Sequence, residues 1–121
     1  MRTAFSIAVA VLALAAAGQA QAHARLLHAA PGVGATVRGS PATLRLAFSE
    51  TIVPTGSSVA VSGPGGRAVA TGPLAIDAKD KRVVVVAPSA PLRPGAYKVS
   101  WGMTTDDGHH TDGTFIFKVA P

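Results

Sequence analysis

The sequence predicts an all-β protein, a single antiparallel β-sandwich or Greek-key barrel of about seven short strands. Glycine and proline are frequent, at 13 and 9 of 121 residues. They interrupt the chain every 8–12 residues or so, which is the spacing of turns in all-β domains. Between them lie short runs rich in β-branched residues, and no run after residue 22 has a helical period. The length fits one domain.

In the first half of the chain, several runs have the alternation of a half-buried strand, in which successive side chains face opposite sides. Residues 24–28 are expected to form a short edge strand before a Pro31-Gly32 turn. Residues 43–49 place two leucines and a phenylalanine on one face, and residues 57–62 place two valines inward. Residues 63–72, which begin Gly-Pro-Gly-Gly, are expected to form an exposed hairpin.

The second half supplies the remaining strands. Residues 82–86 are an arginine followed by four valines, which predicts a strand near the centre of a sheet. A proline-rich connection follows at residues 88–95. Residues 96–103 alternate most regularly, and residues 114–119 close the chain. The stripe on residues 96–103 is expected to be core: Tyr97, Val99, Trp101 and Met103.

Residues 1–22 have the pattern of a cleaved secretory signal peptide: a basic start, an apolar middle and an Ala-x-Ala end. The apolar run is shorter than the roughly 20 residues that a spanning helix needs. Cleavage after Ala22 leaves a domain of residues 23–121 that begins with His23. A second Ala-x-Ala would place the cut after Ala24 instead. We therefore expect an exported protein of the bacterial periplasm that is not embedded in a membrane.

Composition excludes several function classes. The chain has no cysteine, which excludes disulfides, thiolate nucleophiles, iron–sulfur clusters and cysteine zinc sites. The formal net charge is +5, but only 14% of residues are charged and most basic residues are isolated. Nucleic-acid binding is not expected, because the chain shows neither the cluster of basic residues nor the exposed aromatic residues for base stacking that such proteins use.

The polar segment 104–113 joins the two most regular strands and contains three carboxylates and two histidines. The preference of Asp and Gly for turns explains their presence in this segment, but it does not explain the adjacent pair His109 and His110. If the segment is extended, Asp107 and His109 face the same side, and His110 faces the other. Asp107 and His109 are therefore the favoured pair of metal ligands in this segment. A ligand set of Asp106, His110 and Asp112 is the less favoured alternative.

A free N-terminal His23 would offer two nitrogen donors, the α-amine and the imidazole. Both groups in general lose their protons near neutral pH, so a metal displaces those protons at low cost. One imidazole and one carboxylate from the 106–110 loop would complete a set of three nitrogens and one oxygen. This set suits the tetragonal preference of Cu(II), although Zn(II) also accepts it.

The sequence after residue 22 resembles the CopC family of exported copper-binding proteins over nearly its whole length. The resemblance rests on an ordered set of short segments rather than on one motif. They are His23-Ala24-Arg25-Leu26-Leu27, Pro31-Gly32-Val33-Gly34, Leu44-Arg45-Leu46-Ala47-Phe48-Ser49-Glu50, the stretch from Leu92 to Trp101, and Asp107-Gly108-His109 before Gly113-Thr114-Phe115.

The resemblance implies an immunoglobulin-like or cupredoxin-like Greek-key sandwich that binds one Cu(II) per chain. The implied ligands are the amine and imidazole of His23, together with Asp107 and His109. Glu50 would lie beside them and orient the amine or a bound water. A separate Cu(I) site is not expected, because the methionines are only Met1 and Met103. His28 is expected to be a surface residue.

The resemblance implies copper resistance, homeostasis or delivery, by binding and transfer rather than by turnover. The expected partners are the copper ion and either an inner-membrane copper transporter or another periplasmic copper protein. One alternative is a copper oxidase or monooxygenase, since a pair of histidines that includes the N-terminal one also occurs in copper-dependent polysaccharide monooxygenases. The other is an immunoglobulin-like interaction module that binds no metal.

Overall fold

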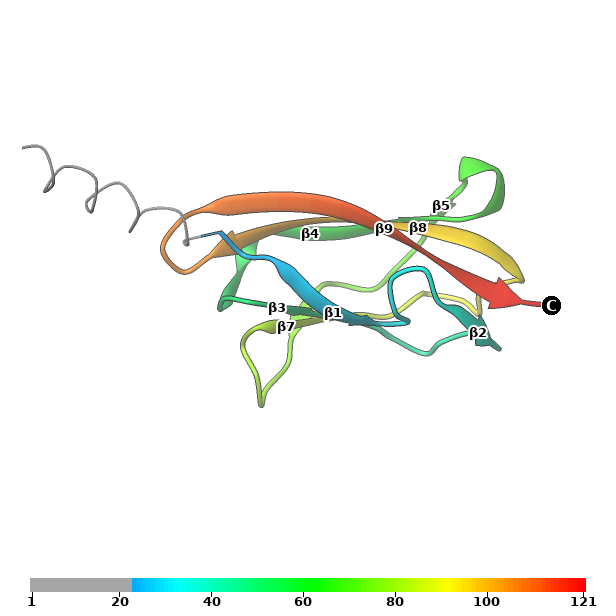
Figure 1. The fold of residues 1–121 in the computed structure, drawn as a ribbon, viewed down its shortest axis with the longest axis horizontal. Helices are drawn as coiled ribbons and strands as arrows, with labels where there is room; N and C mark the ends of the chain where they lie inside the picture. Colours follow the sequence, from blue (N-terminus) through cyan, green and yellow to red (C-terminus); the bar gives the residue numbers. More distant parts are fainter. Residues whose placement is uncertain (1–22) are drawn as a thin grey trace, which may run out of the picture.

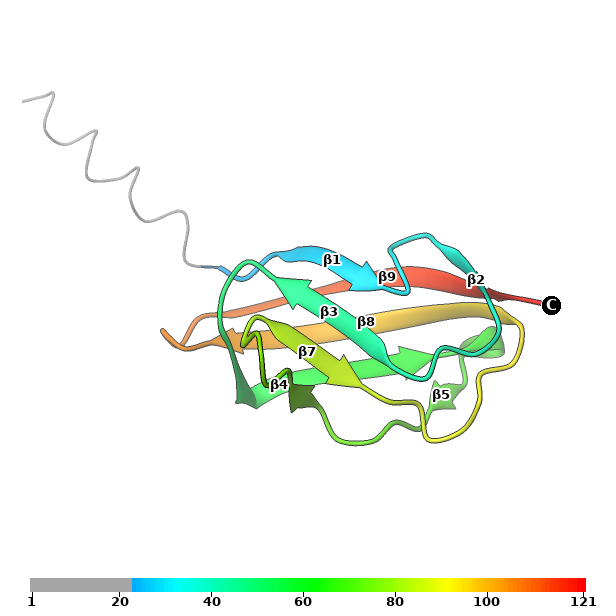
Figure 2. The same cartoon turned by 90° about the horizontal axis from the view of Figure 1, so that it is seen from below.

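A computed structural model describes residues 23–121, which form two facing β-sheets (Figures 1 and 2). The four-stranded sheet has the order β1-β3-β7-β6, with β1 (Leu26–Ala30), β3 (Leu44–Phe48), β7 (Val83–Val86) and β6 (Ala75–Ile76). The five-stranded sheet has the order β2-β9-β8-β4-β5, with β2 (Thr36–Arg38), β9 (His110–Ala120), β8 (Gly95–Thr105), β4 (Ile52–Ser62) and β5 (Ala68–Val69). A single 3₁₀ turn, Pro64–Gly66, joins β4 to β5. The predicted signal peptide lies outside the described residues.

The predicted fold class is confirmed. Neighbouring strands are antiparallel except for the pair β2 and β9, which is parallel. The expected hairpin at residues 63–72 is present as β4 and β5 around the 3₁₀ turn. The described residues form nine strands rather than about seven, because the prediction missed β2 and β6. Strands of two or three residues are too short to show an alternating pattern.

The core lies between the inward faces of the two sheets. The expected stripe on β8 is buried: Tyr97 and Trp101 are 4% and 8% exposed, while Val99 and Met103 are fully buried. The indole of Trp101 meets the ring of Phe48 edge to face, with 5.0 Å between centroids. Since β3 carries Phe48 and β8 carries Trp101, this contact joins the two sheets.

The four-valine strand β7 is an interior strand of its sheet, as expected, but only one of its faces is covered. Val84 and Val86 are buried, whereas Val83 and Val85 are half-buried. A continuous apolar run is typical of a strand that is covered on both faces. Here the other sheet covers one face only, so the second pair of valines remains partly open to solvent.

The long strands β8 and β9 run the length of the sandwich and define its two ends (Figure 2). One end, which we call the loop end, carries residues 106–109, the start of the described chain and the β3–β4 and β6–β7 connections. The opposite end, which we call the far end, carries β2, β5 and the C-terminus. Among residues 23–121, the structure contains no helix of the length and hydropathy that membrane crossing requires.

Gly113 on β9 lies directly opposite Trp101 on β8. A Cβ atom at this position would lie 2.5 Å from Cζ2 of the Trp101 indole. Gly113→Ala is therefore expected to displace the indole and lower the free energy of unfolding by about 1–3 kcal/mol. Gly32→Ala is the control, because its Cβ would meet atoms no closer than 3.6 Å. Urea unfolding measures both variants, and equal stability of the two would contradict this account of the packing.

Candidate metal centre

The loop between β8 and β9 is a tight turn rather than the extended segment that the sequence analysis considered. The backbone N–H of Gly108 donates to the carbonyl of Thr105 at 3.0 Å, and the N–H of Thr105 donates to the carbonyl of His109 at 2.9 Å. Gly108 has a φ of +86°, a conformation that glycine adopts without a steric penalty. The turn, and not strand alternation, brings the side chains of Asp107 and His109 together.

Asp107 and His109 form the centre of this loop. Oδ1 of Asp107 lies 3.1 Å from Nδ1 of His109. The same oxygen accepts hydrogen bonds from the hydroxyl of Thr105 and, at 3.4 Å, from the backbone N–H of His109. The hydroxyl of Thr105 and then the side chain of His109 are the main causes that lower the pKa of Asp107 to about 2. Asp107 is therefore an ionised carboxylate throughout the neutral and mildly acidic range.

The start of the described chain is fixed against the same end of the sandwich. Ala24 is fully buried. The backbone N–H of Arg25 donates to Oγ of Ser49, and the N–H of Ser49 donates to the carbonyl of Arg25, both at 2.9 Å. These contacts place the imidazole of His23 against that of His109, with ring centroids 5.2 Å apart at an interplanar angle of 76°.

The spacing of the His23 and His109 rings beside Asp107 is compatible with a shared metal ion. An imidazole nitrogen binds a metal at about 2 Å, so two rings on one ion have centroids about 4.5–6.5 Å apart. The observed 5.2 Å lies in that range. Nδ1 of His109 and Oδ1 of Asp107 face one another at 3.1 Å. A metal ion bound by both groups would take the place of this contact.

The three side chains do not by themselves form a complete site. Within residues 23–121, no three His, Asp or Glu side chains converge closely enough to hold an ion. The further donor expected from the sequence is the α-amine of His23. That nitrogen belongs to a peptide bond as long as Ala22 precedes it, so it becomes a donor only after cleavage.

The alternative set of Asp106, His110 and Asp112 is not brought together in this way. Nδ1 of His110 lies 3.0 Å from Oγ1 of Thr104 on β8. The ring of His110 covers Gly102, whose Cβ, if present, would lie 3.2 Å from Nε2. The adjacent histidines thus have different surroundings, and only His109 contacts His23.

A bulge in β4 supports the position of His110. The pairing of β4 with β8 shifts between Val53 and Ser58. Within the bulge, Gly56 has a φ of +80°, and its carbonyl accepts a hydrogen bond from Oγ1 of Thr104 at 3.0 Å. Because Thr104 also contacts His110, the bulge connects β4 to the first residue of β9.

Glu50 and His28 lie apart from these contacts. Glu50 is half-buried in the bend between β3 and β4, one residue after Ser49, and has no hydrogen bond or ion pair with the residues that the structure describes. His28 is exposed on β1. The sequence analysis did not identify two residues that position the site, Thr105 and Ser49. Thr105 precedes Asp107 by two residues, a spacing typical of side-chain turns, whereas Ser49 carries no such local signal.

Comparison with known proteins identifies the family. The family model described as the CopC domain matches residues 26–120. The chain belongs to the CopC family. The resemblance noted from the sequence is therefore confirmed. The CopC match begins three residues after His23, so it does not itself include the first candidate ligand.

Individual CopC relatives match most of the chain. Protein YobA of Escherichia coli K12 is 34% identical over 98 residues, which are 81% of this chain and 79% of YobA. Copper resistance protein C of Pseudomonas syringae pv. tomato is 32% identical over 103 residues, 81% of each chain. The crystal structure of PcoC, a methionine-rich copper resistance protein from E. coli, superimposes with a TM-score of 0.74 at 29% identity, covering 81% of this chain and 99% of PcoC.

Thr105→Val tests the cause of the low pKa of Asp107. The substitution keeps the shape of a buried side chain and removes the hydroxyl that donates to Asp107. The pKa of Asp107 is expected to rise from about 2 toward its ordinary value of 3.8. A carboxyl ¹³C NMR titration of the metal-free protein measures both values. An unchanged pKa in the variant would show that His109 alone holds the carboxylate ionised.

Proposed function

We propose that this CopC family member is a periplasmic Cu(II)-binding protein that serves copper resistance, homeostasis or delivery. The observation that carries the proposal is the contact of the His23 and His109 rings beside the ionised carboxylate of Asp107. The copper resistance proteins among its relatives support the choice of copper. Residues 1–22, with their signal-peptide pattern, support export to the periplasm.

The proposed ligands for one Cu(II) are the amine and imidazole of His23, the imidazole of His109 and the carboxylate of Asp107. Cleavage after Ala22 creates the amine beside the imidazole of the same residue. Nitrogen and carboxylate donors of this kind suit Cu(II). Glu50 follows Ser49, which is hydrogen-bonded to Arg25, and we assign it the role of orienting the amine or a bound water.

The proposed site holds Cu(II) and not Cu(I). Cu(I) prefers thioether and thiolate sulfur. The chain has no cysteine, and its methionines are Met1 and Met103. Met103 is fully buried in the core. PcoC is described as methionine-rich. In contrast, no methionine is exposed among residues 23–121 of this chain.

Binding and transfer of copper fit the described side chains better than catalysis by a copper enzyme does. The aromatic side chains of the described sandwich are all buried, which leaves no flat aromatic face for a polysaccharide: Phe48, Tyr97, Trp101, Phe115 and Phe117. Asp107 would also occupy a position that oxygen activation needs open. The proposed recipient of the copper is an inner-membrane copper transporter or another periplasmic copper protein.

Substitution of the two histidines separates the proposed ligand from a surface histidine. His109→Ala in the chain that begins at His23 is expected to weaken Cu(II) binding about 100-fold or more, since loss of a ligand exceeds the 10–100-fold cost of a supporting residue. His28→Ala is the control and is expected to leave binding unchanged. Competition with a chromogenic Cu(II) chelator measures both. An equal loss of Cu(II) affinity in both variants would contradict the choice of His109 as the ligand. Absence of Cu(II) uptake by the unsubstituted chain would favour an interaction module that binds no metal.

The affinity for Cu(II) is expected to fall as the pH drops below about 6. Protons compete with copper for amine and imidazole nitrogens, and imidazoles in general titrate near pH 6.5. The carboxylate of Asp107 adds no loss in this range, because its pKa is about 2. Chelator competition at pH 5, 6 and 7 measures the slope, and constant affinity across this range would contradict the proposed nitrogen ligands.

A further inference from the structure

The far end of the sandwich, opposite the candidate metal centre, is strongly basic. It carries five exposed cationic side chains, on β2, β8, β9 and the segments that follow the 3₁₀ turn and precede β8. None of the five has an ion-pair partner among residues 23–121. These residues, which we call the basic end, are Arg38, Arg67, Arg93, Lys98 and Lys118.

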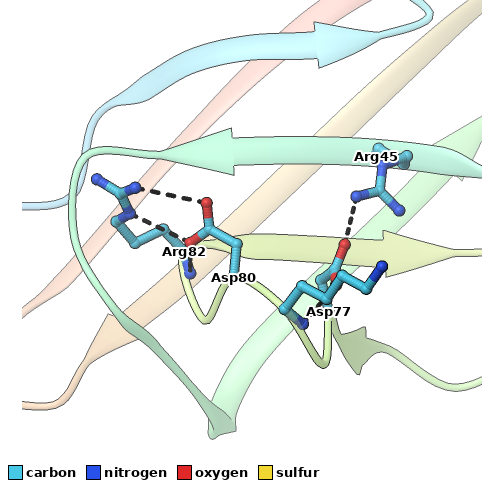
Figure 3. Close-up of polar contacts among 5 residues, drawn as sticks. Arg45, Asp77, Asp80 and Arg82 are labelled. Atoms are coloured by element: carbon cyan, nitrogen blue, oxygen red, sulfur yellow. Dashed lines mark hydrogen bonds and ion pairs between the residues drawn. The ribbon is translucent and has the colours of Figure 1, made fainter.

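The carboxylate side chains lie elsewhere. On the four-stranded sheet and its β6–β7 turn, Asp77 pairs with Arg45 and Asp80 pairs with Arg82 at 3.2 Å (Figure 3). The other carboxylates lie at or toward the loop end, where Asp112 faces Gly102 on β8. Arg45 and Arg82 thus have carboxylate partners, whereas none of the five cations of the basic end has one among residues 23–121.

The basic end also contains a concave surface. A pocket of about 530 Å³ lies between the β4–β5 hairpin and the connection before β8. Its walls are largely apolar, formed by Pro64, Val69, Pro91, Leu92, Pro94 and Tyr97. Arg67 and Arg93 also line it, and both are exposed. The volume is typical of pockets that hold a small molecule or the side chains of a bound peptide.

The pocket wall is held in place from inside the core. The hydroxyl of Tyr97 donates a hydrogen bond of 2.6 Å to the carbonyl of Arg93, and its ring stacks on Phe117 at 5.5 Å. The N–H of Leu92 donates to Oγ of Ser40 at 2.7 Å. These contacts fix the segment that carries Arg93, so the pocket exists before any occupant arrives.

We infer that this pocket is a docking site for an acidic segment of a partner protein, with an apolar side chain in the pocket and carboxylates on Arg67 and Arg93. Charge complementarity selects an anionic occupant, because the basic end has five cations and no neutralising side chain. Guanidinium groups bind carboxylates in a bidentate manner, which favours arginine at such a site. The site is remote from the loop end, so a docked partner leaves the copper ligands accessible.

A peptide fits the basic end better than a membrane surface does. Membrane binding at the pocket would use protruding apolar side chains beside Arg67 and Arg93. Among residues 23–121, the large exposed apolar residues are Leu27, Val33 and Ile116. Ile116 lies opposite Lys98 on the five-stranded sheet, and none of the three lines the pocket. The pocket is instead a recess with cations beside it, the shape that receives a side chain.

The test is an NMR titration of the ¹⁵N-labelled chain that begins at His23 with short acidic peptides, each with a central Leu, Phe or Tyr. The amide signals of Arg67, Val69 and Arg93 are expected to shift. The double variant Arg67→Glu and Arg93→Glu is expected to weaken binding about tenfold or more. The matched control is Lys79→Glu with Lys81→Glu, which makes the same change in net charge on exposed residues at the loop end.

Several outcomes would overturn the inference: no shifts at the pocket, equal weakening in both double variants, or binding of phosphatidylglycerol vesicles but not of the peptides. Should the first double variant fail to fold, Arg67→Gln with Arg93→Gln replaces it. Copper affinity is measured in parallel and is expected to be unchanged by either pocket variant. Failure of the docking site and failure of the copper site are therefore separate results.

Discussion

The candidate metal centre depends on one constraint, the fixing of the first residues of the domain against the β3–β4 bend. Burial of Ala24 and the two hydrogen bonds between Arg25 and Ser49 determine where His23 lies. Without them, the first residue of a chain would move freely, and its amine and imidazole would bring no preorganised contribution to binding. With them, the first residue that the structure describes lies beside a turn more than 80 positions later.

The length of the sandwich separates the proposed copper site from the proposed docking pocket. The strands β8 and β9 pair along their whole extent and carry the turn with Asp107 and His109 at one end. The pocket with Arg67 and Arg93 lies at the other end of the same strands. Between them, the core formed by Trp101, Phe48 and their neighbours gives both ends a rigid support. In this arrangement a partner held at the far end would not cover the proposed copper ligands.

The sequence was sufficient to predict the fold class and part of each long strand, because alternation over five or more residues reports which face is buried. The first half of β4 and the start of β9 were not predicted as strand. The stripe from Tyr97 to Met103 is the clearest case, and all four residues are buried. The short strands β2 and β6 were missed, since they depend on pairing with β9 and β7 and not on a local pattern. The turn at Gly108 was also missed, although it keeps Asp107 and His109 on one side as strand alternation would have done.

The contacts that position the site were the least predictable from sequence. The bond between Ser49 and Arg25 joins residues 24 positions apart, and the contact between His23 and His109 follows from it. The grouping of cations at the far end was equally hidden, because its members are scattered singly along the chain and meet only through the topology.

The most direct test of the account is the intact mass of the exported protein, measured with and without one equivalent of Cu(II). The account predicts a chain that begins at His23 and gains one copper ion. A chain that begins at Arg25 would lack the amine and imidazole of His23 altogether. That result would contradict the account, because only Asp107 and His109 of the proposed ligands would then remain.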